Sequence, residues 1–108
     1  MSEQQSGTRY QVAIEVIKER VSQGKYVISY THTEKMRQRK IEAQDIEKAI
    51  SRGRIIEDYP DDPRGHSCLI LGYTSKGRAL HVLCGKLEAE EILIITGYEP
   101  SPEEWESD

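Results

Sequence analysis

Two histidines and one tyrosine could transfer protons in this 108-residue chain. His32 lies at the start of a predicted helix, His81 inside a predicted strand, and Tyr98 at the end of the last predicted strand. A histidine exchanges protons near neutral pH, and a tyrosine can donate a proton or position a phosphate. Structural roles are equally open: either histidine could hydrogen-bond to a neighbour, and Tyr98 could pack at a sheet edge.

Basic side chains lie close to these groups along the chain. Lys35 and Arg39 follow His32 by three and seven residues, and seven residues correspond to two helical turns along one face. Arg78 lies at the exit of a predicted hairpin loop. Ammonium and guanidinium groups bind phosphate, so these three residues are candidate substrate-binding groups. Arg39 could instead pair with an acid such as Asp58, and Arg78 could simply be solvated.

These side chains match the needs of metal-independent RNA cleavage. In that reaction the ribose 2′-OH attacks the adjacent phosphorus while a base removes its proton, a cation stabilises the phosphoryl charge, and an acid protonates the leaving 5′-oxygen. A helix N-terminus at His32 favours phosphate binding and the neutral, base-competent imidazole. The sequence contains no nucleotide-binding glycine pattern, catalytic-serine motif or zinc motif, so no cofactor or metal is expected.

The orientation of His81 depends on a predicted β-hairpin over residues 67–85. If Gly77 closes a three-residue loop in the left-handed conformation, Thr74 pairs with Arg78. Alternation then gives a core face of Cys68, Ile70, Leu80, Val82 and Cys84. The other face carries Leu69, Leu71, Tyr73, His81 and Leu83. The facing cysteines are expected to stay free thiols in a reducing cytosol.

The remaining elements follow from capping signals and periodicity. A first helix should begin near Thr8 and end at Gly24, and residues 25–30 form a short strand or an extended lead-in. Thr31 and Glu34 predict a capping box for a helix over about 32–39. A second helix starts near residue 42 and stops at Gly53. Strands follow over residues 54–59 and 92–98, the second inside the sheet, and His66, beside a turn at 60–65, should be exposed.

This order of elements predicts an α+β fold. N-terminal helices should pack on one face of a curved, mainly antiparallel four-stranded sheet, leaving the other face open to solvent or a partner. Residues 1–8 are expected to be disordered, residues 9–98 to form a single domain, and residues 99–108 to be an acidic, proline-containing tail. Trp105 in that tail is expected to fold back onto the domain.

Composition limits the class of protein. Phe is absent and hydrophobic residues make up 36%, so the core must rest on Ile, Leu, Val and Tyr. No apolar run approaches the roughly 20 residues of a membrane helix, and no secretion signal is visible, so the expected compartment is the cytoplasm. The last ten residues hold five acids and no Lys or Arg. The first 98 residues therefore carry 15 basic and 14 acidic side chains, a near-neutral body with a local basic patch.

Several motifs together resemble a bacterial family, domain-of-unknown-function family 4258. They are Tyr30-Thr-His32-Thr-Glu-Lys-Met36-Arg-Gln-Arg39-Lys-Ile41, Gly53-Arg-Ile-Ile-Glu57-Asp-Tyr59, Gly77-Arg-Ala-Leu-His81-Val and Ile95-Thr-Gly-Tyr98-Glu-Pro. The resemblance covers about residues 26–105 and departs from the usual pattern at Thr33, where alanine is typical. It implies a relation to RelE-like or barnase-like ribonuclease toxins, often paired with a cognate antitoxin. By position it supports His32, Arg39, His81 and Tyr98 as site residues.

The sequence thus leaves several functions open. The first is a metal-independent endoribonuclease-like toxin with an RNA substrate and a cognate antitoxin protein as partners. The alternative is a non-catalytic module that binds protein or RNA through the open sheet face. A homodimer formed through an exposed strand and a DNA-reading helix-turn-helix are weaker alternatives, the latter because the first helix of that pair is short.

Overall fold

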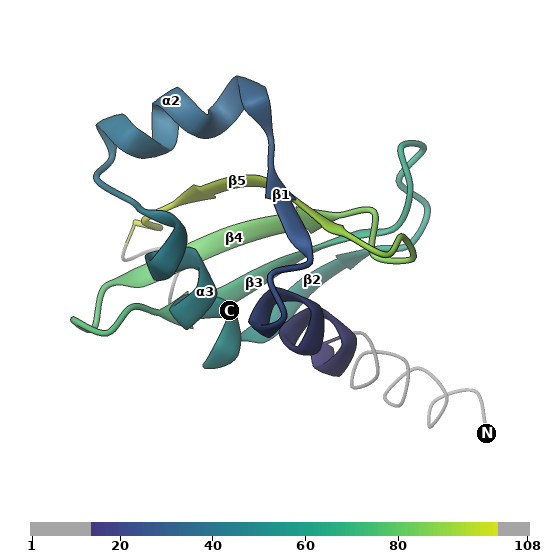
Figure 1. Ribbon diagram of the computed structural model, residues 1–108, viewed down its shortest axis with the longest axis horizontal. Helices are drawn as coiled ribbons and strands as arrows, with labels where there is room; N and C mark the ends of the chain where they lie inside the picture. Colours follow the sequence, from purple (N-terminus) through teal and green to yellow (C-terminus); the bar gives the residue numbers. More distant parts are fainter. Residues whose placement is uncertain (1–13, 102–108) are drawn as a thin grey trace.

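The computed structural model describes residues 14–101 and contains one five-stranded sheet (Figure 1). The order across the sheet is β1-β5-β4-β3-β2. The strands are β1 (Tyr26–Ile28), β2 (Arg54–Tyr59), β3 (Ser67–Tyr73), β4 (Ala79–Gly85) and β5 (Ile92–Tyr98). The predictions for residues 1–8, for Thr8 as a cap and for Trp105 concern positions outside the described residues.

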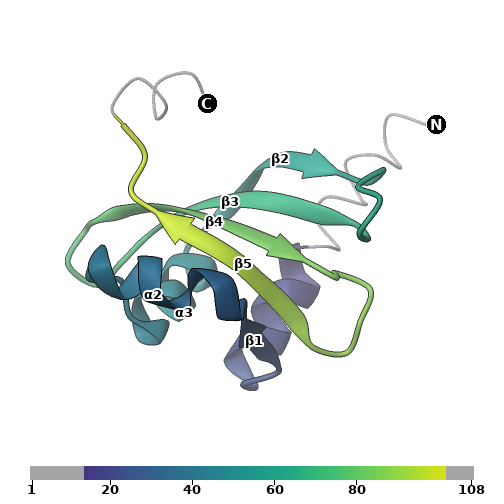
Figure 2. The same cartoon turned by 90° about the horizontal axis from the view of Figure 1, so that it is seen from above.

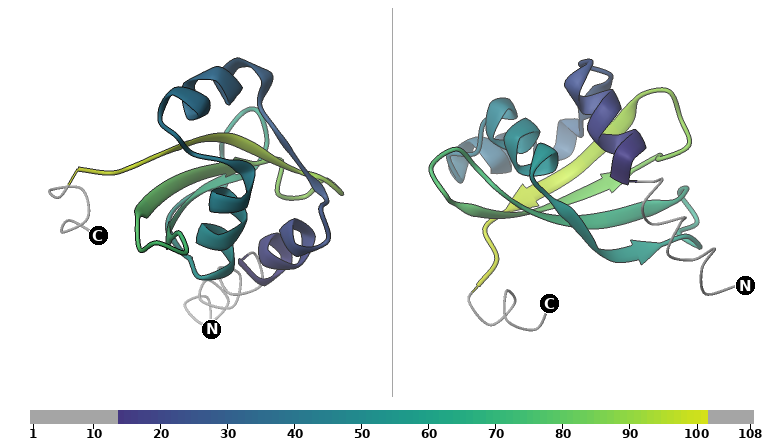
Figure 3. Two further views of the ribbon diagram at one scale, coloured as in Figure 1. Left: turned by 60° about the vertical axis from the view of Figure 1, so that its left-hand side comes forward. Right: turned by 90° about the horizontal axis from the view of Figure 1, so that it is seen from below.

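Three helical segments cover one face of this sheet, and the other face has none among the described residues (Figure 2, Figure 3). They are an N-terminal helix described over residues 14–22, α2 (Tyr30–Gln38) and α3 (Ala43–Ser51). The α+β class and the placement of helices on one face are therefore confirmed. Within residues 14–101, no helix has the length and apolar content needed to cross a membrane.

The expectation of four strands was wrong, because β1 joins the sheet as a fifth strand. It pairs in parallel with β5, which places Tyr26 opposite Ile92 and Ile28 opposite Ile94. The other three pairings are antiparallel, so the sheet is mixed. A three-residue strand whose partner lies more than 60 positions along the chain has no turn signal in the sequence to identify it. β5 lies between β1 and β4, inside the sheet as predicted, but only one of its faces is fully buried.

The predicted hairpin register is confirmed. Cys68 faces Cys84, and Leu71 faces His81. Gly77 has φ +81°, and the Thr74 amide donates to the carbonyl of Arg78 at 2.9 Å. The predicted core face is fully buried against the helices, together with Ile17, Ile46, Ala49, Ile50, Ile92 and Ile94.

Both cysteines are free thiols, and burial raises the pKa of Cys68 to about 12, so this thiol is a poor nucleophile.

Close packing of α3 on the sheet depends on two glycines. A Cβ at Gly72 would lie 1.9 Å from the carbonyl oxygen of Ala49, and one at Gly53 would lie 2.6 Å from Cγ2 of Ile70. Gly53 does follow the end of α3, but the C-cap is Arg52 and the φ of Gly53 is not positive. Its role is to leave room for α3 against β3, whereas the sequence suggested a helix stop.

The start of α2 differs from the predicted capping box. The helix begins at Tyr30, with Ser29 as N-cap, so Thr31 already lies inside the first turn. The Thr31 hydroxyl pairs with the hydroxyl of Ser29 at 3.0 Å, and Glu34 forms an ion pair with Arg37 at 2.8 Å. With Ser29 as N-cap, the third helical residue is His32 and not Glu34, so the predicted capping box does not form.

The end of α2 is a Schellman motif with a lysine in the left-handed position. Lys40 has φ +59°, its amide donates to the carbonyl of Arg37, and the Ile41 amide donates to the carbonyl of Met36 at 2.9 Å. Met36 and Ile41 are both buried, which supplies the hydrophobic contact of this motif.

Replacing Lys40 with glycine is expected to stabilise the fold by about 0.5–1 kcal/mol, because glycine adopts this conformation without a Cβ penalty. Chemical denaturation measures the change. The matched control is Arg52→Gly at the end of α3, where φ is −107° and glycine should destabilise. A loss of stability in both variants would contradict the left-handed conformation assigned to Lys40.

Candidate functional site

The open face of the sheet brings two of the predicted catalytic side chains together. His81 on β4 lies directly opposite Tyr98 on β5. Its Nδ1 atom is 3.3 Å from the Tyr98 hydroxyl, and the two rings meet edge to face with centroids 5.4 Å apart. His81 is on the face predicted for it, but only 3% of its surface is exposed. Tyr98 is therefore the member of this pair that a ligand on the sheet can reach.

A cavity of about 730 Å³ lies over this face, beside Tyr98. Its floor is Leu69 and Leu83, and its aromatic walls are Tyr59 and Tyr98. The loop after β2 completes it, and we call it the tyrosine cavity. Its lining residues are Asp58, Tyr59, Pro60, Asp61, Asp62, Pro63, Arg64, Ser67, Leu69, Leu83 and Tyr98.

A second hollow of about 320 Å³ contains His32, and we call it the histidine groove. The first turn of α2 forms one side, the loop before β3 another, and the end of β4 and the first half of β5 the floor. Its lining residues are Ser29, Thr31, His32, Asp62, Arg64, Gly65, Ser67, Gly85, Lys86, Leu93 and Ile95. The Nδ1 atom of His32 is buried and has no hydrogen-bond partner among the described residues.

The two hollows share one wall, made by Asp62, Arg64 and Ser67. The Ser67 hydroxyl donates to Asp62 Oδ2 at 2.8 Å, and the backbone amide and Nε of Arg64 donate to Asp62 Oδ1 at 3.0 and 3.2 Å. These donors, led by the Arg64 amide, lower the pKa of the Asp62 carboxyl to about 2. The shared wall is therefore a fixed carboxylate that orients one arginine.

The bonds to Asp62 should weaken only in strong acid. Because the folded-state pKa lies below the unfolded value of about 3.9, their stabilising effect is complete above that pH and is lost as the pH falls toward 2. An NMR titration of the side-chain carboxyl carbon is expected to give a midpoint near 2, and Ser67→Ala should raise it. Ser75→Ala, in the hairpin loop, should leave it unchanged, and a wild-type midpoint near 4 would contradict the assignment.

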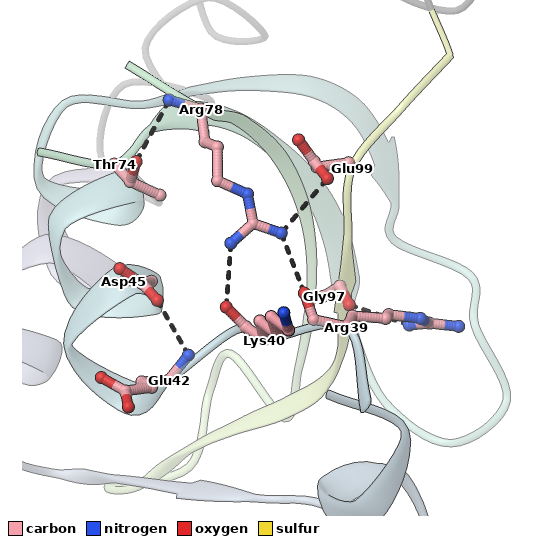
Figure 4. A network of polar contacts seen from close by, with 8 residues as sticks. All are labelled: Arg39, Lys40, Glu42, Asp45, Thr74, Arg78, Gly97 and Glu99. Carbon is pink, nitrogen blue, oxygen red and sulfur yellow. Dashed lines mark hydrogen bonds and ion pairs between the residues drawn. The ribbon is translucent and has the colours of Figure 1, made fainter. Parts of the chain in front are cut away.

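Arg39 and Arg78, two of the predicted phosphate-binding residues, donate hydrogen bonds to main-chain carbonyls (Figure 4). Arg78 donates to the carbonyls of Lys40 and Arg39 at 2.9 and 3.0 Å and to Glu99 Oε1 at 3.2 Å. Arg39 donates to the carbonyl of Gly97 at 2.9 Å. These bonds tie the end of α2 to β5 and to the hairpin. The alternatives of a solvated Arg78 and an acid partner for Arg39 were therefore wrong.

The remaining predicted site residues lie apart. His32 lines the histidine groove and Tyr98 the tyrosine cavity, so these two reach the common wall from opposite sides. Lys35 is exposed on α2 and lines neither hollow.

The sequence reasoning missed the basic residues of the histidine groove. Arg64 comes from the turn cluster after β2, and Lys86 follows the end of β4. Lys86 has φ +52° and no ion pair within residues 14–101. In the sequence, Lys86 is marked only by its position directly after a predicted strand. Its place near α2 depends on the folded sheet, so the sequence could not identify it as a groove residue.

His66 was expected to be exposed, and this was wrong. Its Nε2 lies 2.5 Å from Asp58 Oδ1, and the two side chains are 16% and 7% exposed. Asp58 faces Cys68 across β2 and β3, so this pair belongs to the helix-covered side of the sheet. No group of three or more metal-ligating side chains occurs in residues 14–101.

Comparison with known proteins assigns the chain to a family. Residues 28–99 match the family model described as "Domain of unknown function (DUF4258)". The match covers most of the chain, so the protein belongs to this family, as the sequence motifs indicated. No curated protein and no solved structure matched the chain. The matched range includes His32, Lys86 and Tyr98, and with them both hollows of the open face.

Proposed function

We propose that this protein is a metal-independent endoribonuclease-like toxin that binds RNA in the histidine groove and cleaves it by 2′-OH attack. The observation that carries the proposal is the meeting of His32 with Lys86, which has no ion pair within residues 14–101, in one hollow that also contains the Asp62–Arg64 pair. A base and a phosphate-binding cation are the first two requirements of that chemistry. The groove volume of about 320 Å³ is at the small end of the range for ligand pockets and suits one nucleotide.

Each step of the cleavage has a candidate group. His32 takes the proton of the 2′-OH, and Lys86 offsets the charge that develops on the phosphoryl oxygens. Tyr98, in the adjoining cavity, gives its proton to the leaving 5′-oxygen and takes one back from solvent, while His81 Nδ1, 3.3 Å from its hydroxyl, orients that hydroxyl. Lys86 suits this role because it lines the same groove as His32 and forms no ion pair within residues 14–101.

The toxin role rests on the family resemblance and on the architecture. No described helix lines the tyrosine cavity, and only the first turn of α2 borders the histidine groove, so both hollows are accessible to a large substrate and to a cognate antitoxin. A RelE-like or barnase-like origin and a cytoplasmic location belong to the same proposal.

A non-catalytic binding module is the second candidate. It is favoured by the use of Arg39 and Arg78 as internal donors, which removes two cations from the substrate side. It is also favoured by the separation of His32 from the His81–Tyr98 pair into two hollows. This candidate predicts RNA or protein binding without turnover.

Incubation of the pure protein with a labelled single-stranded RNA in EDTA tests the proposal. Cleavage with 2′,3′-cyclic phosphate at the new ends is expected, because 2′-OH attack leaves that group. RNA that is bound but stays intact would support the second candidate. Cleavage that stops in EDTA, or products without cyclic phosphate, would contradict the mechanism.

A further inference from the structure

We propose that the tyrosine cavity binds an arginine side chain presented by a partner protein. The tyrosine cavity is a different hollow from the histidine groove, and Tyr98 is the only residue with a role in the proposed cleavage that lines it. Only the consequence of arginine binding for RNA cleavage rests on the proposed function.

The aromatic and apolar lining suits the length of an arginine side chain. Tyr59 and Tyr98 form walls on either side of a floor of Leu69 and Leu83, and Tyr59 is 39% exposed. A guanidinium group stacks on aromatic faces, and the three methylenes of arginine cover apolar surface. An aliphatic side chain would fill the floor but leave the polar rim unused.

The charge of the rim favours a cation. The charged lining residues are Asp58, Asp61, Asp62 and Arg64. Asp58 pairs with His66 on the helix-covered side, and Arg64 offsets Asp62. Asp61 therefore contributes an exposed carboxylate without an ion pair among the described residues, and the cavity carries excess negative charge. Carboxylates bind guanidinium through two parallel hydrogen bonds.

A partner protein anchored by an arginine in this cavity would also cover the histidine groove, which contains His32. Asp62, Arg64 and Ser67 separate the tyrosine cavity from the histidine groove, so a protein anchored on one side of this wall would extend over the other. Arginine is enriched among the residues that dominate binding at protein interfaces. The partner would thus act as an inhibitor of cleavage by exclusion of RNA.

Titration of the full-length protein with two short peptides tests the inference. The probes are acetyl-Leu-Arg-Leu-amide and the same peptide with neutral citrulline, followed by NMR of the Leu69 and Leu83 methyl groups and the Tyr59 ring. The arginine peptide should shift these signals and bind about 5–10-fold more tightly than the citrulline peptide, which corresponds to about 1–1.4 kcal/mol. Equal binding of the two peptides, or no shifts, would overturn the proposal.

Variants separate the contribution of the Asp61 carboxylate to arginine binding from that of the Tyr59 ring. Asp61→Asn should weaken arginine-peptide binding several-fold, and Tyr59→Leu should do the same while Tyr59→Phe retains binding. Tyr73→Leu is the control, because Tyr73 is exposed on the same face but does not line the cavity. If guanosine monophosphate shifts the cavity signals and the arginine peptide does not, the cavity is a nucleotide site and the inference is wrong. Failure of RNA cleavage would leave the peptide result unaffected.

Discussion

Replacing Gly72 with alanine is expected to lower the free energy of unfolding by more than about 3 kcal/mol, a large fraction of the roughly 5–15 kcal/mol typical of a domain. The new Cβ would lie 1.9 Å from the carbonyl oxygen of Ala49 and 2.6 Å from its carbonyl carbon. Both atoms belong to the backbone of α3, so no side-chain rotation relieves the overlap. α3 must move away from β3, which opens the core around Ile46 and Ile50.

Gly85→Ala is the matched control for this experiment. A Cβ at Gly85 would lie 2.9 Å from Cδ1 of Ile95, the far end of a flexible side chain that can rotate. This variant should lose about 1 kcal/mol or less. Urea denaturation of both variants measures the difference. Similar stability for Gly72→Ala and Gly85→Ala would show that α3 does not pack on the sheet as closely as described.

Replacing His32 with alanine is expected to lower the RNA-cleavage rate by about 10²–10⁴-fold, the range for loss of a general base. RNA affinity should change little, because Arg64 and Lys86 remain in the groove. Single-turnover cleavage in EDTA and separate binding measurements distinguish the two effects. A large fall in affinity with an unchanged rate would assign His32 to binding and remove it from the chemistry.

Thr33→Ala is the control for the His32 variant. Thr33 is exposed, lies one residue from His32 on α2, and does not line the histidine groove. Its hydroxyl donates to the Ser29 carbonyl at 3.0 Å, so the variant also reports any effect of loosening the first turn. Cleavage by Thr33→Ala at close to the wild-type rate is expected. An equal loss in both variants would point to helix disruption.

Local patterns predicted most of the fold. The Gly77 turn and the alternation around it gave the register of β3 and β4, including the core face and the open face that carries His81. The spacing of Ile46, Ala49 and Ile50 predicted the buried side of α3. The parallel pairing of β1 with β5 was not predicted, because no local sequence pattern identifies a strand partner that is distant along the chain.

The site was less predictable than the fold for the same physical reason. Arg39 and Arg78 were read as phosphate ligands from their charge, but each finds carbonyl acceptors on segments far away in the sequence. The cations that do line the histidine groove, Arg64 and Lys86, come from loops at the ends of β2 and β4. Only the folded sheet places those loops beside the first turn of α2.

The most direct test of the central claim is to locate RNA on the protein. An RNA dinucleotide with a 2′-O-methyl group cannot be cleaved by 2′-OH attack, and its titration into isotope-labelled protein can be followed by NMR. We expect saturable shifts at His32, Lys86 and Ser67, with none on the exposed side of α3. Shifts centred on the helix-covered face, or no shifts at low salt, would contradict the assignment of the histidine groove as the RNA site.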